Sequence, residues 1–335
     1  MTRFSLNIVT GNLPFQEPFR ISGYTFKDWA VVVAEVSDGT HLGRGEACGV
    51  YYLGETAESM AAQIESVRGV IEAGISRQAL RKLMPAGGAR NAVDCALWEL
   101  EARQLGRSVW QLAGLSQVRP LLTVYTLGAD DPDAMVKAAL VAADFPSLKL
   151  KLTGEAQLDV ERVKAVRAAR PDAWIGIDAN QGYTAKTLPV ILDCLERERV
   201  SLFEQPVARG GEAQLDGIRC PIPIAADESV LTVDEIAALV GRFDVVNIKL
   251  DKCGGLTEAL MMIAEARRLG LLTMVGNMSG SSWATAAGYV VGQLCDFVDL
   301  DGPVHILEDR SPAVRYEHGY VICDDAVWGS RTGSV

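Results

Sequence analysis

The stretch that decides the fold is residues 147–180, SLKLKLTGEAQLDVERVKAVRAARPDAWIGIDAN. Two short apolar runs within it, at 147–152 and 174–178, have the length and composition of buried strands. The segment between them has the apolar spacing of a helix. A strand, a helix and a second strand in this order predict one unit of a parallel sheet.

The same alternation continues from about residue 119 toward the C-terminus. Eight strands are expected, each except the last followed by a segment with helical spacing, and eight such units in roughly 190 residues predict an α/β fold of the (β/α)8, TIM-like barrel type. A doubly wound sheet is the competing arrangement, but residues 126–131, TLGADD, lack the GxGxxG spacing of its phosphate loop. The expected strands are residues 121–126, 147–152, 174–178, 201–205, 222–226, 245–250, 272–276 and 297–300.

A smaller α+β domain is predicted before the barrel, at residues 1–115. Its antiparallel sheet is expected to turn at Asp38-Gly39. The tail 306–335, with a strand at 320–323, is too short for a domain and is expected to complete this first one, which leaves 116–305 for the barrel and its active site. The expected strands of the first domain are 4–9, 29–36 and 43–48, and its expected helices are 57–73 and 89–105.

Composition excludes several classes of function. With 335 residues, 49% of them hydrophobic, the chain can bury a large core. The net charge of -11 and the absence of a Lys/Arg cluster argue against nucleic acid as a partner. No apolar run reaches the roughly 18 residues of a membrane span, so we expect a cytoplasmic protein without membrane contact. Seven scattered cysteines and three separate histidines argue against disulfide frameworks, zinc sites and Ser-His-Asp chemistry.

Three carboxylates end successive expected strands. Asp178, Glu204 and Asp227 therefore meet at the C-terminal mouth of the barrel, where such folds carry their active sites. Without a cation these neighbours would repel one another strongly. Ligands that are all oxygen favour Mg²⁺ over softer metals. The alternative is that they are separate ion-paired or helix-capping residues.

Lysines are expected on opposite sides of this mouth. Lys149 and Lys151 share one face of a strand, and Lys249 ends a strand across the barrel. A lysine close to a cation and to a second lysine has its neutral form favoured, which lets it act as a base. We expect Lys151 and Lys249 to transfer protons on opposite faces of one carbon while Lys149 supports the charge. Lys252 is expected to be a surface or loop residue.

Asp299 and Asp301, two apart at the end of the last strand, are not needed as metal ligands. Spare carboxylates at the mouth suggest a cationic substrate group such as an α-ammonium, which an N-acylated substrate would lack. The alternative is a salt-bridged or loop-capping pair before Gly302 and Pro303.

In the order and placement of these motifs the chain resembles the enolase superfamily, within it the muconate lactonizing enzyme subgroup, over essentially its whole length. The motifs are KxK at 149–151, DAN at 178–180, EQP at 204–206, DES at 227–229 and NIKLDKCGG at 247–255. Residues 85–98, PAGGARNAVDCALW, and DLDGP at 299–303 look most like dipeptide epimerases of the L-Ala-D/L-Glu epimerase type.

The resemblance implies an isomerase that holds one Mg²⁺ per subunit on the three carboxylates. It implies 1,1-proton transfer, by Lys151 and Lys249 through an enediolate, at the α-carbon of the C-terminal residue of a dipeptide. Supporting positions map to Lys149, Asn180 and Glu228, and the pair that holds the substrate ammonium maps to Asp299 and Asp301. The resemblance also implies a small-molecule substrate and makes a homo-oligomer the expected assembly.

Other functions remain open at this point. An N-acetyl or N-succinyl amino acid racemase would use the same lysines, whereas a cycloisomerase or dehydratase would use one of them only to guide charge. A barrel that binds a partner without catalysis would retain the carboxylates only as a structural metal site.

The resemblance makes the N-terminal domain a capping domain, whose loops at 20–27 and 49–55 would close over the barrel and read the substrate side chain. Alanyl-glutamate epimerases carry an arginine just after the Ile-Ser of the first loop, and this chain has Gly23 there. We therefore expect an apolar or aromatic pocket, although the same aromatic residues would also suit hinge packing. The expected pocket residues are Tyr24, Phe26, Tyr51 and Tyr52, with Asn277, where a cysteine is expected, and Ser279 after strand seven.

Overall fold

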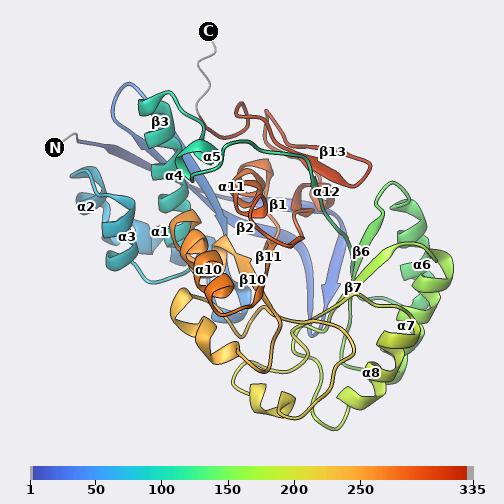
Figure 1. The fold of residues 1–335 in the computed structure, drawn as a ribbon. Helices are drawn as coiled ribbons and strands as arrows, with labels where there is room; N and C mark the ends of the chain where they lie inside the picture. The colour runs from blue at the N-terminus through green and yellow to red at the C-terminus, as the bar shows by residue number, and fades with distance from the viewer. Residues whose placement is uncertain (1–2, 330–335) are drawn as a thin grey trace.

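The computed structural model describes residues 3–329, and its centre is an eight-stranded parallel sheet in the order β5 to β12. Each strand pairs with the one before it in the chain, as repeated strand–helix units require. A hydrogen bond from Val124 N to Val298 O, 3.4 Å long, joins the two ends of the sheet. The expected barrel with a capping domain is thus confirmed (Figure 1). The strands are β5 (Tyr125–Leu127), β6 (Ser147–Lys151), β7 (Trp174–Asp178), β8 (Leu202–Glu204), β9 (Ile224–Ala226), β10 (Val245–Lys249), β11 (Leu272–Gly276) and β12 (Phe297–Val298).

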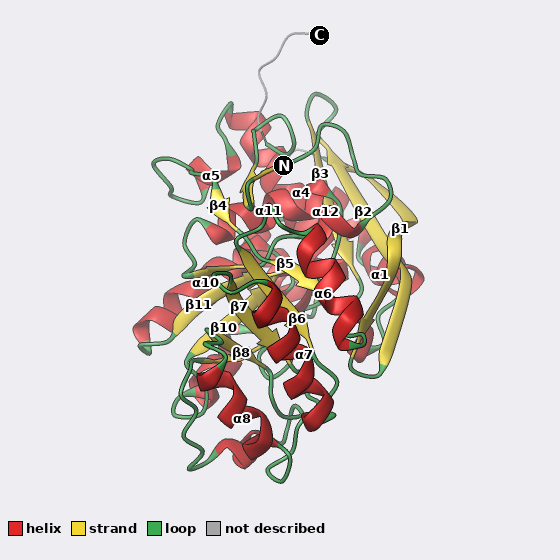
Figure 2. Cartoon of the chain, turned by 90° about the vertical axis from the view of Figure 1, so that its right-hand side faces the viewer, coloured by secondary structure: helices red, strands yellow, loops and turns green. Residues whose placement is uncertain are grey.

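Helices cover the outside of the barrel, and Figures 1 and 2 show α6, α7 and α8 packed in sequence along one side. After β8 and β9 the expected helices are wrong, because only 3-10 turns form there. Between 206 and 223 the chain has three glycines and three prolines, which do not sustain an α-helix. The barrel elements are α6 (Pro132–Val141), α7 (Ala156–Ala169), α8 (Leu188–Arg197), η2 (Glu212–Leu215), η3 (Val233–Leu239), α9 (Leu250–Cys253), α10 (Leu256–Arg268), α11 (Ser282–Gly292) and α12 (Gly302–His305).

The first expected barrel strand, 121–126, is divided in two. Its start, β4 (Leu121–Leu122), leaves the barrel and pairs with β14 (Tyr320–Ile322), which also pairs with β13 (Arg315–Glu317). Only β5 joins the barrel, through β6. Pairing between segments so distant in the chain has no local sequence signal.

The N-terminal domain is a three-stranded antiparallel sheet with helices packed on one face, and Figure 2 shows its strands grouped at one side of the molecule. The first two strands are longer than expected. Pro14 and Pro18 interrupt the alternation that predicts a strand, but the pairing of β1 with β2 continues beyond them, with an irregularity between Pro14 and Phe19. Its elements are β1 (Ser5–Ile21), β2 (Tyr24–Ser37), β3 (Leu42–Cys48), η1 (Tyr51–Leu53), α1 (Ala57–Ser66), α2 (Arg68–Glu72), α3 (Arg77–Leu83), α4 (Gly88–Leu105) and α5 (Val109–Leu112).

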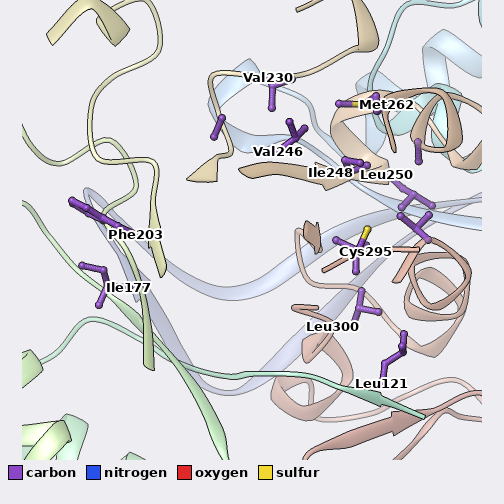
Figure 3. Close-up of a cluster of buried hydrophobic side chains, with 14 of the residues drawn as sticks. Leu121, Ile177, Phe203, Val230, Val246, Ile248, Leu250, Met262, Cys295 and Leu300 are labelled. Atoms are coloured by element: carbon purple, nitrogen blue, oxygen red, sulfur yellow. The ribbon is translucent and has the colours of Figure 1, made fainter. Parts of the chain in front are cut away.

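Separate hydrophobic cores hold the two parts. The larger one lies between the barrel strands and their helices, where Ile177, Phe203 and Ile248 are buried (Figure 3). The smaller one lies between the N-terminal sheet and helices α1 and α4, and it includes Val32 and Ala92. Each core combines side chains from strands and from helices, which neither kind of element could bury alone.

The C-terminal tail contacts both parts of the chain. Besides the pairing of β14 with β4, the Trp328 indole donates a 2.8 Å hydrogen bond to Arg44 O in β3. Across residues 3–329, no helix has the length and apolar character needed to cross a membrane.

Strand β3 lies so close to α4 that glycine is required at Gly45. A Cβ there would stand 2.0 Å from Ala92 O and 2.8 Å from Ala96 N, both backbone atoms. We predict that Gly45→Ala lowers the free energy of unfolding by about 3 kcal/mol, because the strand and helix must move apart. Urea unfolding followed by circular dichroism measures the change.

Gly11→Ala is the matched control in the same sheet, since its Cβ would meet only Val31 Cγ2 at 4.0 Å. We expect it to leave stability unchanged or slightly raised. Equal stability of the two variants would contradict the close approach of β3 to α4.

Candidate functional site

The three expected metal ligands meet at the C-terminal mouth of the barrel. Asp178, Glu204 and Asp227 are buried at the ends of β7, β8 and β9, and one ligand oxygen of each lies within 4.8 Å of the others. Burial opposes ionisation of Asp178 and Asp227, but nearby lysines outweigh it and lower the pKa of both. Burial and the Asp178 charge raise the pKa of Glu204 to about 7. The lysines therefore stabilise the charged forms of Asp178 and Asp227, whereas Glu204 is held closer to its protonated form.

Lys151 and Lys249 approach this cluster from opposite sides. Lys151 Nζ lies 2.6 Å from Asp178 Oδ2, and Lys249 Nζ lies 2.7 Å from Asp227 Oδ2. Their strands, β6 and β10, are four apart in the eight-stranded order, which places them across the barrel from each other. Such an arrangement can present an amine to each face of a bound carbon atom.

The charge balance at Lys249 differs from the one expected for a base beside a cation. Burial favours its neutral form, but the Asp227 and Glu204 carboxylates outweigh burial and raise its pKa. Lys149 is held still more tightly, because its Nζ lies 2.6 Å from Asp299 Oδ2 and 2.7 Å from Glu204 Oε2. Within the chain itself, lysines and carboxylates are each other's counter-ions.

The expectation that Lys252 is a surface or loop residue is wrong. Its side chain is buried beneath the site, with Nζ 2.5 Å from Asp227 Oδ1, 2.6 Å from Asp227 O and 3.1 Å from Asn247 O. The residue follows β10 directly on the short helix α9, which turns it back under β9. A lysine close to two glycines suggested an exposed loop. Only the path of the chain in three dimensions shows that the side chain is buried.

Sequence reasoning also missed two amides that contact the residues of this cluster, one at a carboxylate and one at a backbone N–H. Asn247 Nδ2 donates a 2.8 Å hydrogen bond to Glu204 Oε1, and Gln205 Oε1 accepts from Asp227 N at 2.9 Å. Asn247 had a usable signal, because it lies two residues before Lys249 and so shares its face of the strand. Gln205 has a left-handed backbone, with φ of 37°, that no sequence pattern indicated.

Asp299 and Asp301 lie together at the end of β12. Asp299 Oδ1 is buried and has no hydrogen-bond partner among the described residues, although Oδ2 binds Lys149. Burial raises the pKa of Asp299 against the Lys149 charge. Asp301 Oδ2 accepts from Thr126 N at 2.6 Å and lies 3.0 Å from His305 Nε2, a partner that sequence reasoning missed.

Asn180 and Glu228 border the cluster on the side of β7 and β9. Asn180 N donates to Asp178 Oδ1 at 2.8 Å, and the backbone of Asn180 has a positive φ of 42°. Burial and the charges of Asp227 and Asp178 raise the pKa of Glu228 to about 8. Its Oε2 has no partner within the described chain, so Glu228 leaves one buried carboxyl oxygen unpaired beside Asp227.

The N-terminal domain supplies an aromatic wall over this mouth. Phe26, Trp29 and Tyr51 pack against one another, with ring centroids 4.4 to 6.0 Å apart. Tyr24 is not on the inner wall, because it packs on Tyr51 from outside and is 49% exposed. The expected loop at 20–27 is the tip of the β1–β2 hairpin.

A cavity joins these groups into one site. It is bounded by the lysines, Asp227, Glu228, Asp299 and Asp301 below and by the aromatic wall above. Asn277 and Ser279 also line it, and Asn277 Nδ2 donates a 2.7 Å hydrogen bond to Asp299 O. The buried Ser279 hydroxyl has no partner in residues 3–329. Except for Tyr24 and the expected metal ligands Asp178 and Glu204 beneath it, every expected site residue lines this cavity.

Two protein families and several known proteins are similar to this chain. The N-terminal domain of the mandelate racemase / muconate lactonizing enzyme family matches residues 3–114, and the enolase C-terminal domain-like family matches 133–326. The L-Ala-D/L-Glu epimerase of Escherichia coli (strain K12) is 38% identical over 91% of this chain and 95% of its own.

Two solved structures are also similar. One is an enolase family member from Agrobacterium tumefaciens with homology to dipeptide epimerases, bound to sodium and L-Ala-L-Glu, with a TM-score of 0.93, 41% identity and coverage of 97% and 100% of the two chains. The other is a dipeptide epimerase from Enterococcus faecalis V583 in complex with Mg and L-Leu-L-Tyr, with a TM-score of 0.88, 26% identity and coverage of 98% and 99%. The chain therefore belongs to the mandelate racemase / muconate lactonizing enzyme family of the enolase superfamily, among its dipeptide epimerases.

Proposed function

We propose that this protein is a Mg²⁺-dependent epimerase that inverts the α-carbon of the C-terminal residue of a dipeptide. The observation that carries the proposal is the pair Lys151 and Lys249 on opposite sides of one carboxylate cluster. An isomerase of this kind needs one group to remove a proton and another, on the far face, to return one.

Asp178, Glu204 and Asp227 suit one Mg²⁺ per chain. They offer only oxygen ligands, lie within reach of a common centre, and are buried where like charges repel. When bound, the ion supplies Lewis acidity that holds the substrate carboxylate and offsets the charge developing as the α-proton leaves. Asn247 and Lys252 hold Glu204 and Asp227 in place for it.

The chain's own residues move the proton. Nζ of one lysine removes it from the α-carbon, and Nζ of the lysine across the barrel delivers a proton to the opposite face. Lys149 donates to Asp299 and neighbours Glu204, so it acts as a fixed positive charge rather than as a base. Burial of these lysines and carboxylates strengthens the interactions between their charges.

Asp299 and Asp301 favour a substrate with a free amino group. The partnerless Asp299 Oδ1 offers a buried acceptor, and an ammonium would satisfy it. An N-acylated amino acid brings no positive charge to this end of the cavity, so the site supports a dipeptide better than an N-acyl substrate.

We also propose roles for the two domains, an assembly and a location for the enzyme. Residues 1–115 with the tail 306–335 would act as the capping unit and 116–305 as the catalytic unit, in a homo-oligomer located in the cytoplasm. Asn180, Glu228, Asn277 and Ser279 would orient the substrate, and Phe26 and Tyr51, backed by Tyr24, would contact its side chain.

The direct test is mass spectrometry of dipeptide and N-acyl amino acid libraries incubated with the protein and Mg²⁺ in D₂O. We expect one added deuterium and an inverted centre in dipeptides with a free amine. Label confined to N-acyl compounds would replace the proposal by an N-acyl racemase, and loss of water or a cyclic product would replace it by lyase or cycloisomerase chemistry.

We predict that Lys151→Ala and Lys249→Ala each lower epimerisation by about 10³-fold or more, because each removes one of two proton carriers. Each variant should still exchange the α-proton of one epimer only, the one that faces the remaining lysine. Lys164→Ala, at an exposed position on α7, is the control and should behave as wild type. Inversion at an undiminished rate in either variant would contradict the two-lysine mechanism.

We predict that Asp178→Asn weakens Mg²⁺ binding by at least about tenfold in titration calorimetry, because one anionic ligand is lost. Asp172→Asn, exposed in the loop just before β7, is the control and should bind Mg²⁺ as wild type does. Chelation by EDTA should abolish epimerisation, and added Mg²⁺ should restore it. Unchanged Mg²⁺ affinity in Asp178→Asn would exclude this residue as a ligand.

A further inference from the structure

His305 lies at the end of the cavity and contacts one of the two carboxylates proposed to hold the substrate amine. It ends the short helix α12, four residues after Asp301, so helical spacing returns its ring toward that residue. His305 Nε2 is 3.0 Å from Asp301 Oδ2, and the ring is largely buried between Phe19 and Tyr125, with centroids 5.5 and 5.0 Å away.

The geometry assigns a hydrogen to Nε2. Burial opposes ionisation of Asp301, but His305 and the Thr126 N–H outweigh it and lower its pKa, so the carboxylate is ionised. An ionised carboxylate only accepts hydrogen bonds, and Nε2 must therefore donate. The ring can donate this hydrogen bond to Asp301 either as a neutral imidazole or as an imidazolium. The two forms differ by one unit of charge.

Few other charges face the ring. Tyr125 packs on it from β5, and Tyr316, beside Asp301, donates its hydroxyl to Leu300 O. On the outer side, a groove that reaches His305 is lined by Glu17 and by Arg20, which is paired with Asp130. Asp301 is thus the charged group in direct contact with the imidazole.

The charge of His305 changes how strongly Asp299 and Asp301 attract an ammonium group. Lys149 already offsets one of the two carboxylates, through its 2.6 Å contact with Asp299. With a neutral His305 the group of Lys149, Asp299, Asp301 and His305 carries one net negative charge, which attracts an ammonium. With a protonated His305 the group is neutral overall, and that attraction is largely lost.

We propose that His305 is a specificity-determining residue, whose charge sets how strongly Asp299 and Asp301 hold a cationic amino group of the substrate. The proposal rests on the function proposed above and deepens it. Free-amine substrates bind well when the imidazole is neutral and poorly when it is protonated, because only the neutral form leaves a net negative charge beside the substrate amine.

The test compares wild type with His305→Gln, whose amide can reach Asp301 as a donor without ever becoming charged. The KM for one dipeptide that wild type epimerises is measured from pH 5.5 to 8 in both enzymes, and the ratio of the two values is plotted. Titration of the lysines, the metal ligands and the substrate amine affects both enzymes and cancels in this ratio. We expect the wild-type KM to be about ten times that of the variant at pH 5.5 and equal to it at pH 8.

A merely structural role for His305 predicts a ratio displaced by the same factor at every pH, and that result would overturn the proposal. His305→Leu fills the space between Phe19 and Tyr125 without charge and serves if His305→Gln is unstable; its KM ratio should show the same dependence on pH. His318→Gln, at an exposed site, is the control and should give a ratio of one throughout.

The two proposals fail in different ways. If wild type incorporates no deuterium into any dipeptide, the proposed function is wrong. If it does so and the KM ratio does not vary with pH, the role of His305 alone is wrong.

Discussion

The rest of the structure depends on the repulsion among carboxylates gathered at the barrel mouth. Asp178, Glu204 and Asp227 each place one carboxylate oxygen within 4.8 Å of the others, although burial would make such a cluster very unstable alone. Four lysines contact the carboxylates at this mouth. The same charges therefore determine how readily the mouth binds a proton or a cation. Either one changes the interactions between all of the neighbouring charges when it enters or leaves.

The N-terminal domain is tied to this charged centre by buried carboxylates. Asp251, two residues after Lys249, accepts hydrogen bonds from Cys48 N at 2.9 Å and from Asn91 Nδ2 at 3.0 Å. Glu46 of β3 accepts from Ser281 N at the start of α11. The aromatic wall is thereby held over the mouth by contacts that begin two residues after Lys249, one of the lysines that line the cavity.

Much of the fold was predictable because a parallel barrel repeats one local pattern. Strands such as Trp174–Asp178 and Leu272–Gly276 were expected with the same bounds, since each is an apolar run between helical segments. The division of 121–126 and the long β1–β2 hairpin were missed, because pairing between distant segments and absorbed prolines leave no periodic signal.

The sequence alone determined which residues end each strand, and therefore that Asp178, Glu204, Asp227 and the lysines share one mouth, because strand direction and period follow from local pattern. Only the tertiary structure decided which of these groups touch. It buried Lys252 against Asp227, joined His305 to Asp301 and placed Tyr24 outside the wall. Such contacts depend on the path of short helices and hairpin tips, whose direction is set by packing between distant elements rather than by the residues that form them.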